Sequence, residues 1–405
     1  MKKVVVIGAG PAGIMAAIEA SNKGNSVLLI DGNEKIGKKL FITGKGRCNV
    51  TNNRDISEFF DFIPGNPYFL YSSLYTFTNL DTINFFESKG IQLKVERGER
   101  MFPKSDKSSD ILKGLNIGLK EAGVKVKLNS LVTDINVSKE NTINYIEVNN
   151  TEKIYGDHFI LATGGASYPL TGSRGDGQKF SKALGHNIVD LKPSLVPIEI
   201  KNSFIKELMG LSLRNIELTL LENNKKVYSG FGEMLFTHYG VSGPLVLKGS
   251  RYIKDKNYVI SLDLKPALDV KALDTRVQND FKKYINKPFK NALDNLLPKK
   301  LIPTVILLSN IDENKQVNEI TKVERKNLVH LLKNFNLDVK GLRSLSEAIV
   351  TAGGVDTKEI DPSTMKSKLI SNLSFAGEVI DVDAFTGGYN VQVALSTGYI
   401  AGSNI

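Results

Sequence analysis

The feature that most constrains the fold is a glycine-rich turn near the start of the chain. The apolar run Val4–Ile7 is typical of a buried parallel strand, and Gly8-Ala9-Gly10-Pro11-Ala12-Gly13 follows it at once. In this G-x-G-x-x-G spacing the first glycine allows a tight turn, and the second lets backbone N–H groups approach a pyrophosphate. The third lets the next helix pack closely on the sheet. We therefore expect a dinucleotide to bind where this strand ends.

The residues after the turn supply the context that a lone glycine motif lacks. A helix is predicted from Pro11 to about Lys23, with its positive N-terminal end at the phosphate. A second strand, Val27–Ile30, ends at Asp31, eighteen residues after the last glycine of the turn. A carboxylate there can accept hydrogen bonds from a ribose hydroxyl. The alternative is an ordinary β-α-β crossover without a nucleotide. Pro11 weakly favours FAD over NAD.

Length and composition indicate a cytoplasmic globular protein of more than one domain. At 405 residues the chain is long enough for two or three domains. Its single cysteine, Cys48, excludes an intramolecular disulfide framework and suits a reducing compartment. Because no run of about eighteen apolar residues occurs, we expect no membrane-spanning helix.

The chain is basic, with a formal net charge of +10. Such an excess favours binding to a polyanion, although it also serves solubility. Residues 281–300 hold six lysines and one acidic residue, with aromatic residues interleaved. Their lysines, Lys282, Lys283 and Lys287 among them, form either a phosphate-binding face or a solvated helical surface.

Three further segments are predicted to approach the cofactor. Residues 32–52 are glycine-rich and basic, which predicts a loop over a phosphate or a flavin edge. The strand 158–161 runs into the small residues Ala162-Thr163-Gly164-Gly165, which allow the backbone to approach a ligand. Near the end, a strand at 373–376 leads into Gly377 and Glu378. The paired glycines 387 and 388 then precede a helix over 391–401, whose N–H groups can face a flavin carbonyl.

These motifs together resemble a known family over nearly the whole chain. The resemblance is to bacterial FAD-binding proteins of the BaiN/YhiN/YtfP type, labelled NAD(P)/FAD-dependent oxidoreductases. One departure is Lys45, where the family usually carries glycine. The motifs that carry the resemblance are the glycine turn 8–13, Gly44-Lys45-Gly46-Arg47-Cys48-Asn49-Val50-Thr51-Asn52, Ala162-Thr163-Gly164-Gly165, Leu235-Phe236-Thr237-His238-Tyr239-Gly240-Val241-Ser242-Gly243-Pro244, Gly377-Glu378-Val379-Ile380-Asp381 and Thr386-Gly387-Gly388-Tyr389-Asn390.

The resemblance implies an α/β fold with a Rossmann-like FAD-binding domain, an inserted β-barrel and a small helical subdomain. We expect the FAD-binding domain to comprise residues 1–193 and 346–405. The barrel would comprise 194–265 and 331–345, and the helical, basic subdomain 266–330. This division agrees with the short strands predicted between 194 and 265, where Ile216–Leu220 alternates in hydrophobicity.

The expected cofactors are FAD and, as electron donor, NADH or NADPH. Only one glycine fingerprint occurs, so no dedicated NAD(P)H domain is predicted. The four histidines are scattered, so no metal site is expected. The predicted cofactor residues are Gly8, Gly10, Pro11, Ala12, Gly13, Asp31, Gly32, Lys39, Gly46, Arg47, Cys48, Val126, Thr163, Gly164, Gly165, Gly377, Glu378, Gly387, Gly388, Tyr389 and Asn390.

Some members of the family resemble dihydrouridine synthases that act on large-subunit (23S) ribosomal RNA. In that hypothesis, hydride passes to C6 of a uracil and an acid protonates C5. Cys48 is the candidate acid, with a buried structural cysteine as the alternative, and His238 is the second candidate. Lys45 and Arg47 would hold phosphates of the RNA or of FAD. The other hypotheses are a small-metabolite flavin oxidoreductase or oxidase, and a non-catalytic FAD-bound redox sensor. The oligomeric state stays open.

Overall fold

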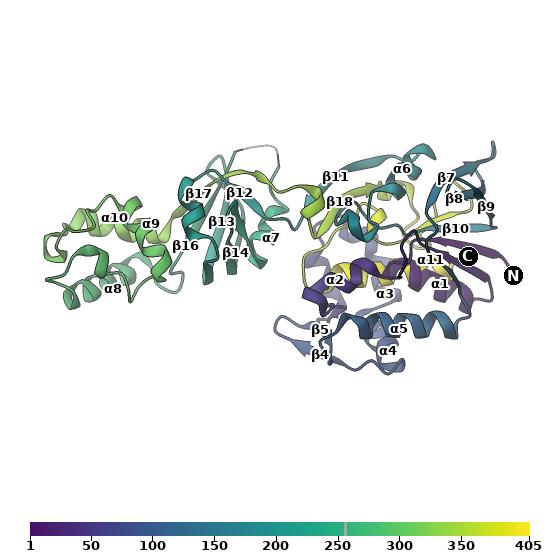
Figure 1. Cartoon of the computed structure of the whole chain (residues 1–405), viewed down its shortest axis with the longest axis horizontal. Coiled ribbons are helices and arrows are strands. Elements are labelled where there is room, and N and C mark those ends of the chain that lie inside the picture. Colours follow the sequence, from purple (N-terminus) through teal and green to yellow (C-terminus); the bar gives the residue numbers. More distant parts are fainter. Residues whose placement is uncertain (255–256) are drawn as a thin grey trace. The chain divides into compact units, whose positions relative to one another are not determined.

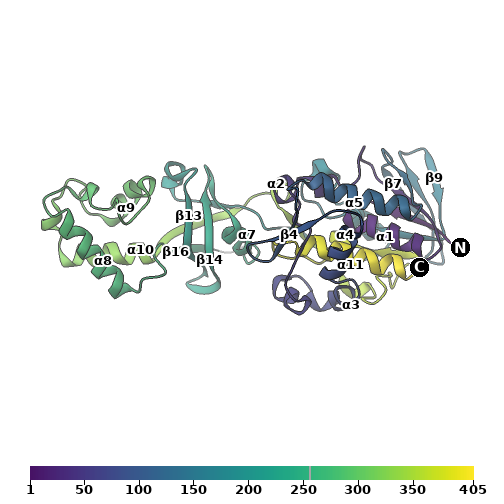
Figure 2. The ribbon, with the colours of Figure 1, turned by 90° about the horizontal axis from the view of Figure 1, so that it is seen from below.

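The structure is a computed structural model, and it describes residues 1–254 and 257–405 (Figures 1 and 2). The chain forms two compact units. The first comprises residues 1–194 and 345–405, and the second comprises residues 195–344. Each unit has its own core of buried apolar side chains. The first unit is discontinuous in sequence because the second is inserted between two of its segments.

The first unit is built on a parallel five-stranded sheet with the order β19-β10-β1-β2-β6. The strands β1 and β10 are buried along almost their whole length, and their buried residues are apolar apart from His158. From β1 the order continues to β2 on one side and to β10 on the other, so the topology switches between β1 and β10. The strands are β1 (Lys3–Ile7), β2 (Ser26–Ile30), β6 (Lys125–Lys127), β10 (His158–Leu161) and β19 (Leu373–Phe375).

Two helices from opposite ends of the chain pack closely beside this sheet, α1 (Pro11–Asn22) and α11 (Tyr389–Ser403) (Figure 1). Small residues make the approach feasible. A Cβ on Gly398 would lie 2.2 Å from the carbonyl oxygen of Ala12, and a Cβ on Gly402 would lie 2.4 Å from that of Ala16. The two ends of the chain therefore share one core.

Smaller elements complete the first unit. Its other helices are α2 (Lys38–Gly46), α3 (Tyr71–Thr76), α4 (Asn79–Ser88), α5 (Ser108–Glu121) and α6 (Asp176–Ala183). Its three small antiparallel sheets are β3-β5-β4 (Thr51–Asn52, Arg100–Pro103, Leu93–Glu96), β7-β8-β9 (Val132–Val137, Ile143–Val148, Glu152–Tyr155) and β11-β18 (Ile188–Ser194, Val350–Val355).

The second unit contains a closed six-stranded barrel and a group of helices. Along β13 the side chains of Ile216, Leu218 and Leu220 are buried, as their alternation predicts. The strands are β12 (Ile198–Ile200), β13 (Ser212–Glu222), β14 (Lys225–Phe236), β15 (Gly240–Ser242), β16 (Tyr258–Asp263) and β17 (Phe335–Leu342). The helices are α7 (Pro244–Ser250), α8 (Val270–Lys283), α9 (Ile302–Ser309) and α10 (Lys322–Lys333).

The predicted fold class is confirmed, since a Rossmann-type parallel sheet and a closed barrel are both present. The prediction that residues 32–52 form a loop is wrong for 38–42, which are helical and place Leu40 in the core. The backbone leaves the helical region at 43–45, and residues 32–37 and 47–50 lie outside helices and strands. In the part of the chain that the structure describes, no helix is long and apolar enough to cross a membrane.

Candidate cofactor site

The turn between β1 and α1 has the shape that its three glycines predict. Gly8 has a φ of +107°, and a Cβ on it would lie 2.4 Å from the carbonyl oxygen of Ala162 after β10. A Cβ on Gly13 would lie 1.9 Å from the carbonyl oxygen of Gly8. Around Gly10, chain neighbours aside, no described heavy atom lies within 4 Å of the Cβ position. The turn is packed on the protein side and open at Gly10, where a pyrophosphate needs space.

The N-terminus of α1 begins at the same opening. Gly10 is the N-cap and has no side chain to cap the helix, and Pro11 occupies the first turn. The first N–H groups of a helix lack partners within the helix and carry the positive end of its dipole. Because phosphates bind such groups, the residues from Gly8 to Gly13 fit a dinucleotide pyrophosphate.

Asp31, at the end of β2, organises the glycine turn in addition to its predicted ribose contact. One carboxylate oxygen accepts a hydrogen bond from the N–H of Ala9 at 2.6 Å. The other accepts from the N–H and the side-chain amide of Asn33, at 2.8 and 2.9 Å. A carboxylate has about four lone-pair sites, so a ribose hydroxyl can still donate to it. Nearby, Gly32 is exposed, and Val126 on the edge strand β6 is also exposed.

Two buried polar atoms beside Gly164 have no hydrogen-bond partner among the described residues. They are Oγ1 of Thr163, just after β10, and Oε1 of Gln178 in α6. The side-chain amide of Gln178 donates to the carbonyl oxygen of Gly164 at 3.1 Å. An unsatisfied buried polar atom costs about 1–3 kcal/mol, and few are left in native proteins. Both atoms are enclosed by protein, so neither is itself a contact point for a ligand.

Three glycines, Gly377, Gly387 and Gly388, lie in the segment that precedes α11. Gly377 has a φ of +75°, and a Cβ on it would lie 2.8 Å from that of Ala12 on α1. Gly387 and Gly388 have φ values of +139° and +96°. Gly388 is the N-cap of α11, and a Cβ there would lie 2.3 Å from the carbonyl oxygen of Thr51. Only glycine fits this approach, and no side chain caps the helix.

Tyr389 and Asn390 hold the start of α11 in place. Tyr389 is buried and stacks on Phe62, with ring centroids 4.6 Å apart. Desolvation by burial raises the pKa of its phenol to about 12. Asn390 accepts a hydrogen bond from the N–H of Ala384 at 2.9 Å and donates to the carbonyl oxygen of the same residue at 2.6 Å. Both side chains therefore position the helix N-terminus.

Lys39 and Glu378, predicted from distant segments, form an ion pair with a Nζ–Oε2 distance of 2.9 Å. Lys39 also donates to Oγ of Ser167 at 2.7 Å, and the second Glu378 oxygen accepts from the N–H of Thr351 at 2.7 Å. A Cβ on Gly165 would lie 3.1 Å from the Glu378 carboxyl carbon. The absence of a side chain at Gly165 therefore makes room for this polar cluster.

The basic residues at the end of α2 differ in whether they already pair with carboxylates. Lys45 and Gly46 are exposed, with φ values of +59° and +82°. Nη1 of Arg47 lies 2.7 Å from a Glu96 oxygen and 2.9 Å from an Asp106 oxygen. The hydrogen bonds to Glu96 and then Asp106 raise the pKa of Arg47. Lys45 is thus open to an additional phosphate, whereas Arg47 is already paired.

Cys48 is completely buried in the core of the first unit. Desolvation raises the pKa of its thiol to about 12. Its backbone has a φ of +59°, and its N–H donates to the carbonyl oxygen of Thr43 at 3.1 Å. These observations favour the structural alternative for this cysteine over the role of proton donor.

His238 belongs to the second unit, where it is exposed in the turn between β14 and β15. Two hydrogen bonds close the turn. The N–H of Thr237 donates to the carbonyl oxygen of Gly240 at 2.8 Å, and the N–H of Gly240 donates to the hydroxyl of Thr237 at 3.2 Å. The imidazole ring meets the Tyr239 ring edge-on at 4.7 Å, and the guanidinium of Arg343 lies 4.6 Å from the centre of the Tyr239 ring. This fixed turn presents His238 to solvent.

The three lysines predicted to contact a polyanion are exposed around the end of α8. Nζ of Lys283 lies 3.6 Å from the buried carboxylate of Asp280. Nζ of Lys287 lies 5.5 Å from the centre of the Tyr284 ring. Within the described residues, Lys282 and Lys287 have no carboxylate within salt-bridge distance. Both can therefore bind an external phosphate.

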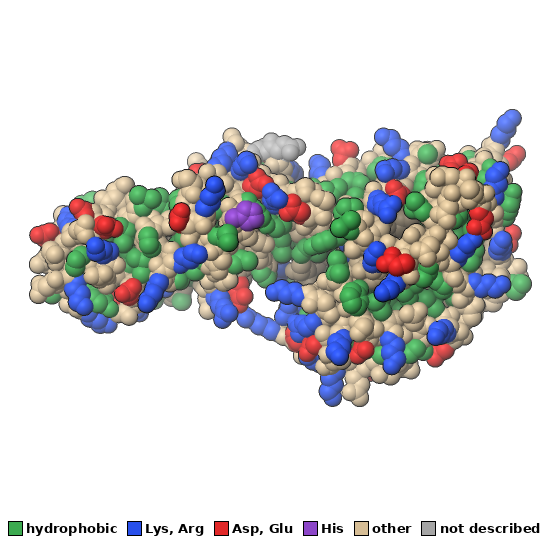
Figure 3. All heavy atoms as spheres, viewed as in Figure 1, with side chains coloured by type: hydrophobic (Ala, Val, Ile, Leu, Met, Phe, Trp, Pro, Cys, Tyr) green, Lys and Arg blue, Asp and Glu red, His purple; other side chains and the backbone are tan. Residues whose placement is uncertain are grey.

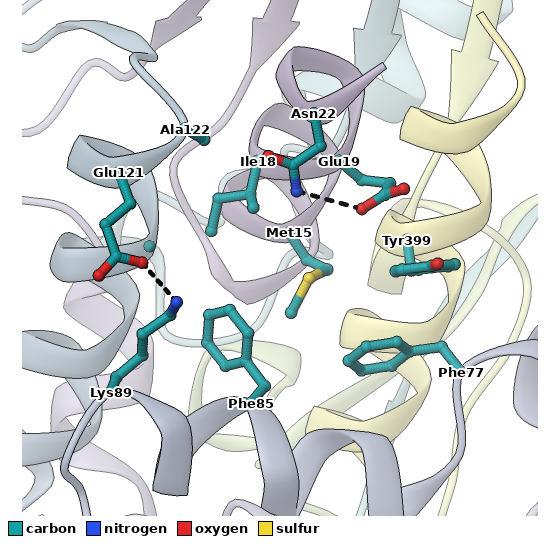
Figure 4. Close-up of a pocket in the computed structure, with 11 residues that line it drawn as sticks. Met15, Ile18, Glu19, Asn22, Phe77, Phe85, Lys89, Glu121, Ala122 and Tyr399 are labelled. Carbon is teal, nitrogen blue, oxygen red and sulfur yellow. Dashed lines mark hydrogen bonds and ion pairs between the residues drawn. The ribbon is translucent and has the colours of Figure 1, made fainter.

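A separate cavity of about 210 Å³ lies at the C-terminal half of α1, away from Gly10 (Figure 4). Phe77, Phe85 and Tyr399 line it, and Glu121 pairs with Lys89 across its edge. Cofactor pockets typically measure about 300–1,000 Å³. This cavity is therefore too small and wrongly placed to be the dinucleotide site.

The sequence matches the family described as HI0933-like protein Rossmann domain over residues 2–404. The chain belongs to this family. The membership predicted from the motifs is therefore confirmed, together with the Rossmann-type fold of FAD-binding proteins. FAD is accordingly the cofactor that the family and the glycine turn support.

Two curated relatives match the HI0933-like chain along its length. The ribosomal RNA dihydrouridine synthase of Haemophilus influenzae is 32% identical over 404 residues, which cover 99% of this chain and 98% of the relative. The 3-dehydro-bile acid delta(4,6)-reductase of Clostridium scindens is 30% identical over 413 residues, with the same two coverages. Among solved structures, a flavocytochrome c3 fumarate reductase in its open conformation has a TM-score of 0.52 at 18% identity, covering 100% of this chain and 78% of that chain. That likeness concerns the fold alone.

Sequence reasoning missed several polar residues of this HI0933-like site. Ser167, Thr351 and Gln178 were not predicted, although their hydrogen bonds connect the predicted segments. Ser167 follows the predicted Thr163–Gly165 run and could have been included on that ground. Thr351 and Gln178 carry no local signal, because tertiary packing alone brings them to the site. Among the described residues, no group of three or more His, Cys, Asp or Glu could hold a metal ion.

Proposed function

We propose that this protein is an FAD-dependent oxidoreductase that uses NADH or NADPH to reduce a uridine of large-subunit ribosomal RNA to dihydrouridine. The observation that supports RNA as the substrate is the distribution of charge between the two units. Residues 195–344 contain 25 Lys and Arg against 16 Asp and Glu, an excess of nine. The other unit contains 28 against 27. Nearly all of the net charge of +10 therefore belongs to the unit without the glycine turn.

This division of charge suits a substrate much larger than the cofactor. Lys and Arg side chains are spread over the visible face of residues 195–344, with acidic side chains among them (Figure 3). Polyanion binding of this kind gains free energy from counterion release and fixes no sequence by itself. A uracil must leave its stack to be reduced, so the substrate would be an exposed or splayed nucleotide.

Of the two candidate acids, Cys48 and His238, we retain His238 for the test. When bound, FAD supplies the hydride that is added to C6 of the uracil ring. A proton must then be added to C5, and an efficient acid has a pKa near the working pH. Cys48 has a pKa of about 12 and no exposed surface, which makes it the weaker candidate. His238 is exposed on a rigid turn.

The experiment is deletion of the gene followed by nucleoside mass spectrometry of purified large-subunit ribosomal RNA. We expect dihydrouridine to disappear and to return with the wild-type gene and with Cys48→Ala. His238→Gln should not restore it, whereas His330→Gln, at an exposed histidine of α10, should. An unchanged dihydrouridine level in the deletion strain refutes the RNA proposal. Restoration by His238→Gln refutes only the assignment of the acid.

A second function, reduction of a small metabolite, is favoured by one observation. The bile acid reductase matches the whole chain nearly as well as the RNA-modifying relative does. Salt separates the two functions, because binding to single-stranded RNA weakens with a slope of about −0.7 per phosphate contact in log–log form. Lys282→Gln combined with Lys287→Gln should reduce that slope. The matched pair Lys120→Gln and Lys139→Gln, exposed in the first unit, should leave it unchanged.

A further inference from the structure

A group of exposed aromatic side chains in the first unit has no part in the cofactor site. Tyr71 and Tyr75 lie one turn apart on α3, and Tyr68 precedes that helix. They are 57%, 43% and 86% exposed. Phe60 stacks on Tyr71 and on Tyr75, with ring centroids 5.7 and 6.1 Å apart. We call these four residues the aromatic surface. Figure 2 shows α3 at the lower margin of its unit.

The segment that carries the aromatic surface is acidic within a basic protein. Residues 55–88 contain five acidic residues and neither lysine nor arginine. Asp55, Glu58 and Asp61 are exposed on the segment around Phe60. Glu58 pairs with Arg54 at 2.8 Å, whereas Asp55 and Asp61 have no basic partner in the described chain.

Asp55 acts at the aromatic surface itself. Partial desolvation, followed by the charges of Tyr71 and Asp55, raises the pKa of Tyr75. Hydrogen bonds from Ser57 lower the pKa of Asp55, so its carboxylate stays ionised near neutral pH. The exposed rings therefore lie in a negative field.

The exposed aromatic rings and the carboxylates beside them together indicate what kind of partner binds there. Contiguous exposed apolar surface that is rimmed by polar residues marks an interaction site. The faces of Phe and Tyr rings attract cations, and arginine also stacks on them. The carboxylates add attraction for a cation and repel the phosphates of a nucleic acid. We propose that the aromatic surface, with Asp55 and Asp61, docks an arginine-rich flexible segment of another protein.

The test measures binding of a fluorescein-labelled peptide of five Arg-Gly repeats to the full-length protein by fluorescence anisotropy. Tyr71→Ser combined with Tyr75→Ser should raise its Kd about tenfold, since two cation–π contacts are lost. Asp61→Lys should raise the Kd several-fold at low salt and less at high salt. The matched controls are Tyr155→Ser, at a tyrosine that is 56% exposed on β9, and Asp134→Lys, at an exposed residue of β7. Neither control should change the Kd.

A Lys-Gly peptide should bind more weakly than the Arg-Gly peptide, because an ammonium does not stack on a ring. The double variant Tyr71→Phe and Tyr75→Phe keeps the rings and should keep binding, which preserves the test if the serine variants fail to fold. Equal weakening by the controls overturns the proposal, and so does absence of wild-type binding. Loss of oligouridine binding in the serine variants would instead assign the surface to RNA. A wild-type dimer that these variants dissociate in sedimentation would assign it to a second copy of the chain.

Discussion

Gly10 and Gly13 lie three residues apart in one turn, yet a methyl group should have opposite consequences at the two positions. Gly13→Ala would place its methyl 1.9 Å from the carbonyl oxygen of Gly8. That oxygen belongs to backbone held by a 2.8 Å hydrogen bond from the N–H of Gly8 to the carbonyl oxygen of Ile30. Overpacking typically costs about 1–3 kcal/mol, and backbone yields less than a side chain. We therefore expect Gly13→Ala to lower the free energy of unfolding by about 3 kcal/mol.

Gly10→Ala should leave the free energy of unfolding nearly unchanged and should strongly weaken the binding of FAD. Gly10 has a φ of −78° and a ψ of 179°, which alanine adopts freely, and the space beside it is open. Replacing glycine by alanine at an N-cap costs about 0.5–1 kcal/mol, which is offset by about 0.4–1 kcal/mol from reduced freedom of the unfolded chain. The methyl occupies the pyrophosphate space. Losing two charge-assisted hydrogen bonds of about 1.5–3 kcal/mol each raises the Kd for FAD by about 10²–10⁴.

The assay combines urea denaturation of the FAD-free protein with a flavin fluorescence titration. Gly341→Ala on β17 is the control, because that glycine also has open space and no positive φ. It should change neither stability nor affinity for FAD. Wild-type affinity in Gly10→Ala would refute the assignment of the turn to the pyrophosphate. Equal loss of stability in Gly10→Ala and Gly13→Ala would refute the packing argument.

Three further predictions concern titration, reactivity and ion pairing. Burial lowers the pKa of His158 to about 4 in the folded state, so between pH 6.5 and 4 the unfolded state binds more protons. The free energy of unfolding should therefore fall by about 3 kcal/mol as the pH drops through that window, and His158→Gln should flatten the dependence measured by urea denaturation. Native Cys48 should not react with Ellman's reagent at pH 8 and should react fully in denaturant, because it is completely buried; rapid native reaction would contradict the structure. Arg47→Ala should cost about 1 kcal/mol in thermal or urea unfolding, with less effect in high salt, because the ion pairs that it loses are partly exposed. An unchanged unfolding midpoint at low salt would show that these pairs contribute nothing.

How far the sequence predicted the fold and the site depended on whether a signal was local. The strand Val4–Ile7, the glycine turn and Asp31 were predicted because their spacing follows from the geometry of a single β-α-β unit. The helix over 38–46 was missed because its glycines and lysines resemble a loop. Packing against the core decides the conformation: residues 38–42 are helical and bury Leu40, and the backbone leaves the helical region at 43–45.

The closed barrel was expected from the resemblance to a family and was confirmed by the strand pairing. Hydrophobic alternation in Ile216–Leu220 predicted one strand of it, but alternation does not reveal whether a sheet closes. Closure depends on β12 pairing with both β15 and β17, and β17 lies more than 130 residues further along the chain. Such long-range pairings leave no trace in local spacing.

The sequence by itself determined the glycine turn, the acid after β2 and the family, because each depends on residues close together or in a fixed order. Only the tertiary structure decided that Lys39, Ser167 and Glu378 meet, since their segments are up to 339 residues apart. It also decided that Cys48 is buried while His238 is exposed, which disfavours Cys48 as the acid. Burial and long-range contact are properties of the packed chain, so residue type and spacing do not fix them.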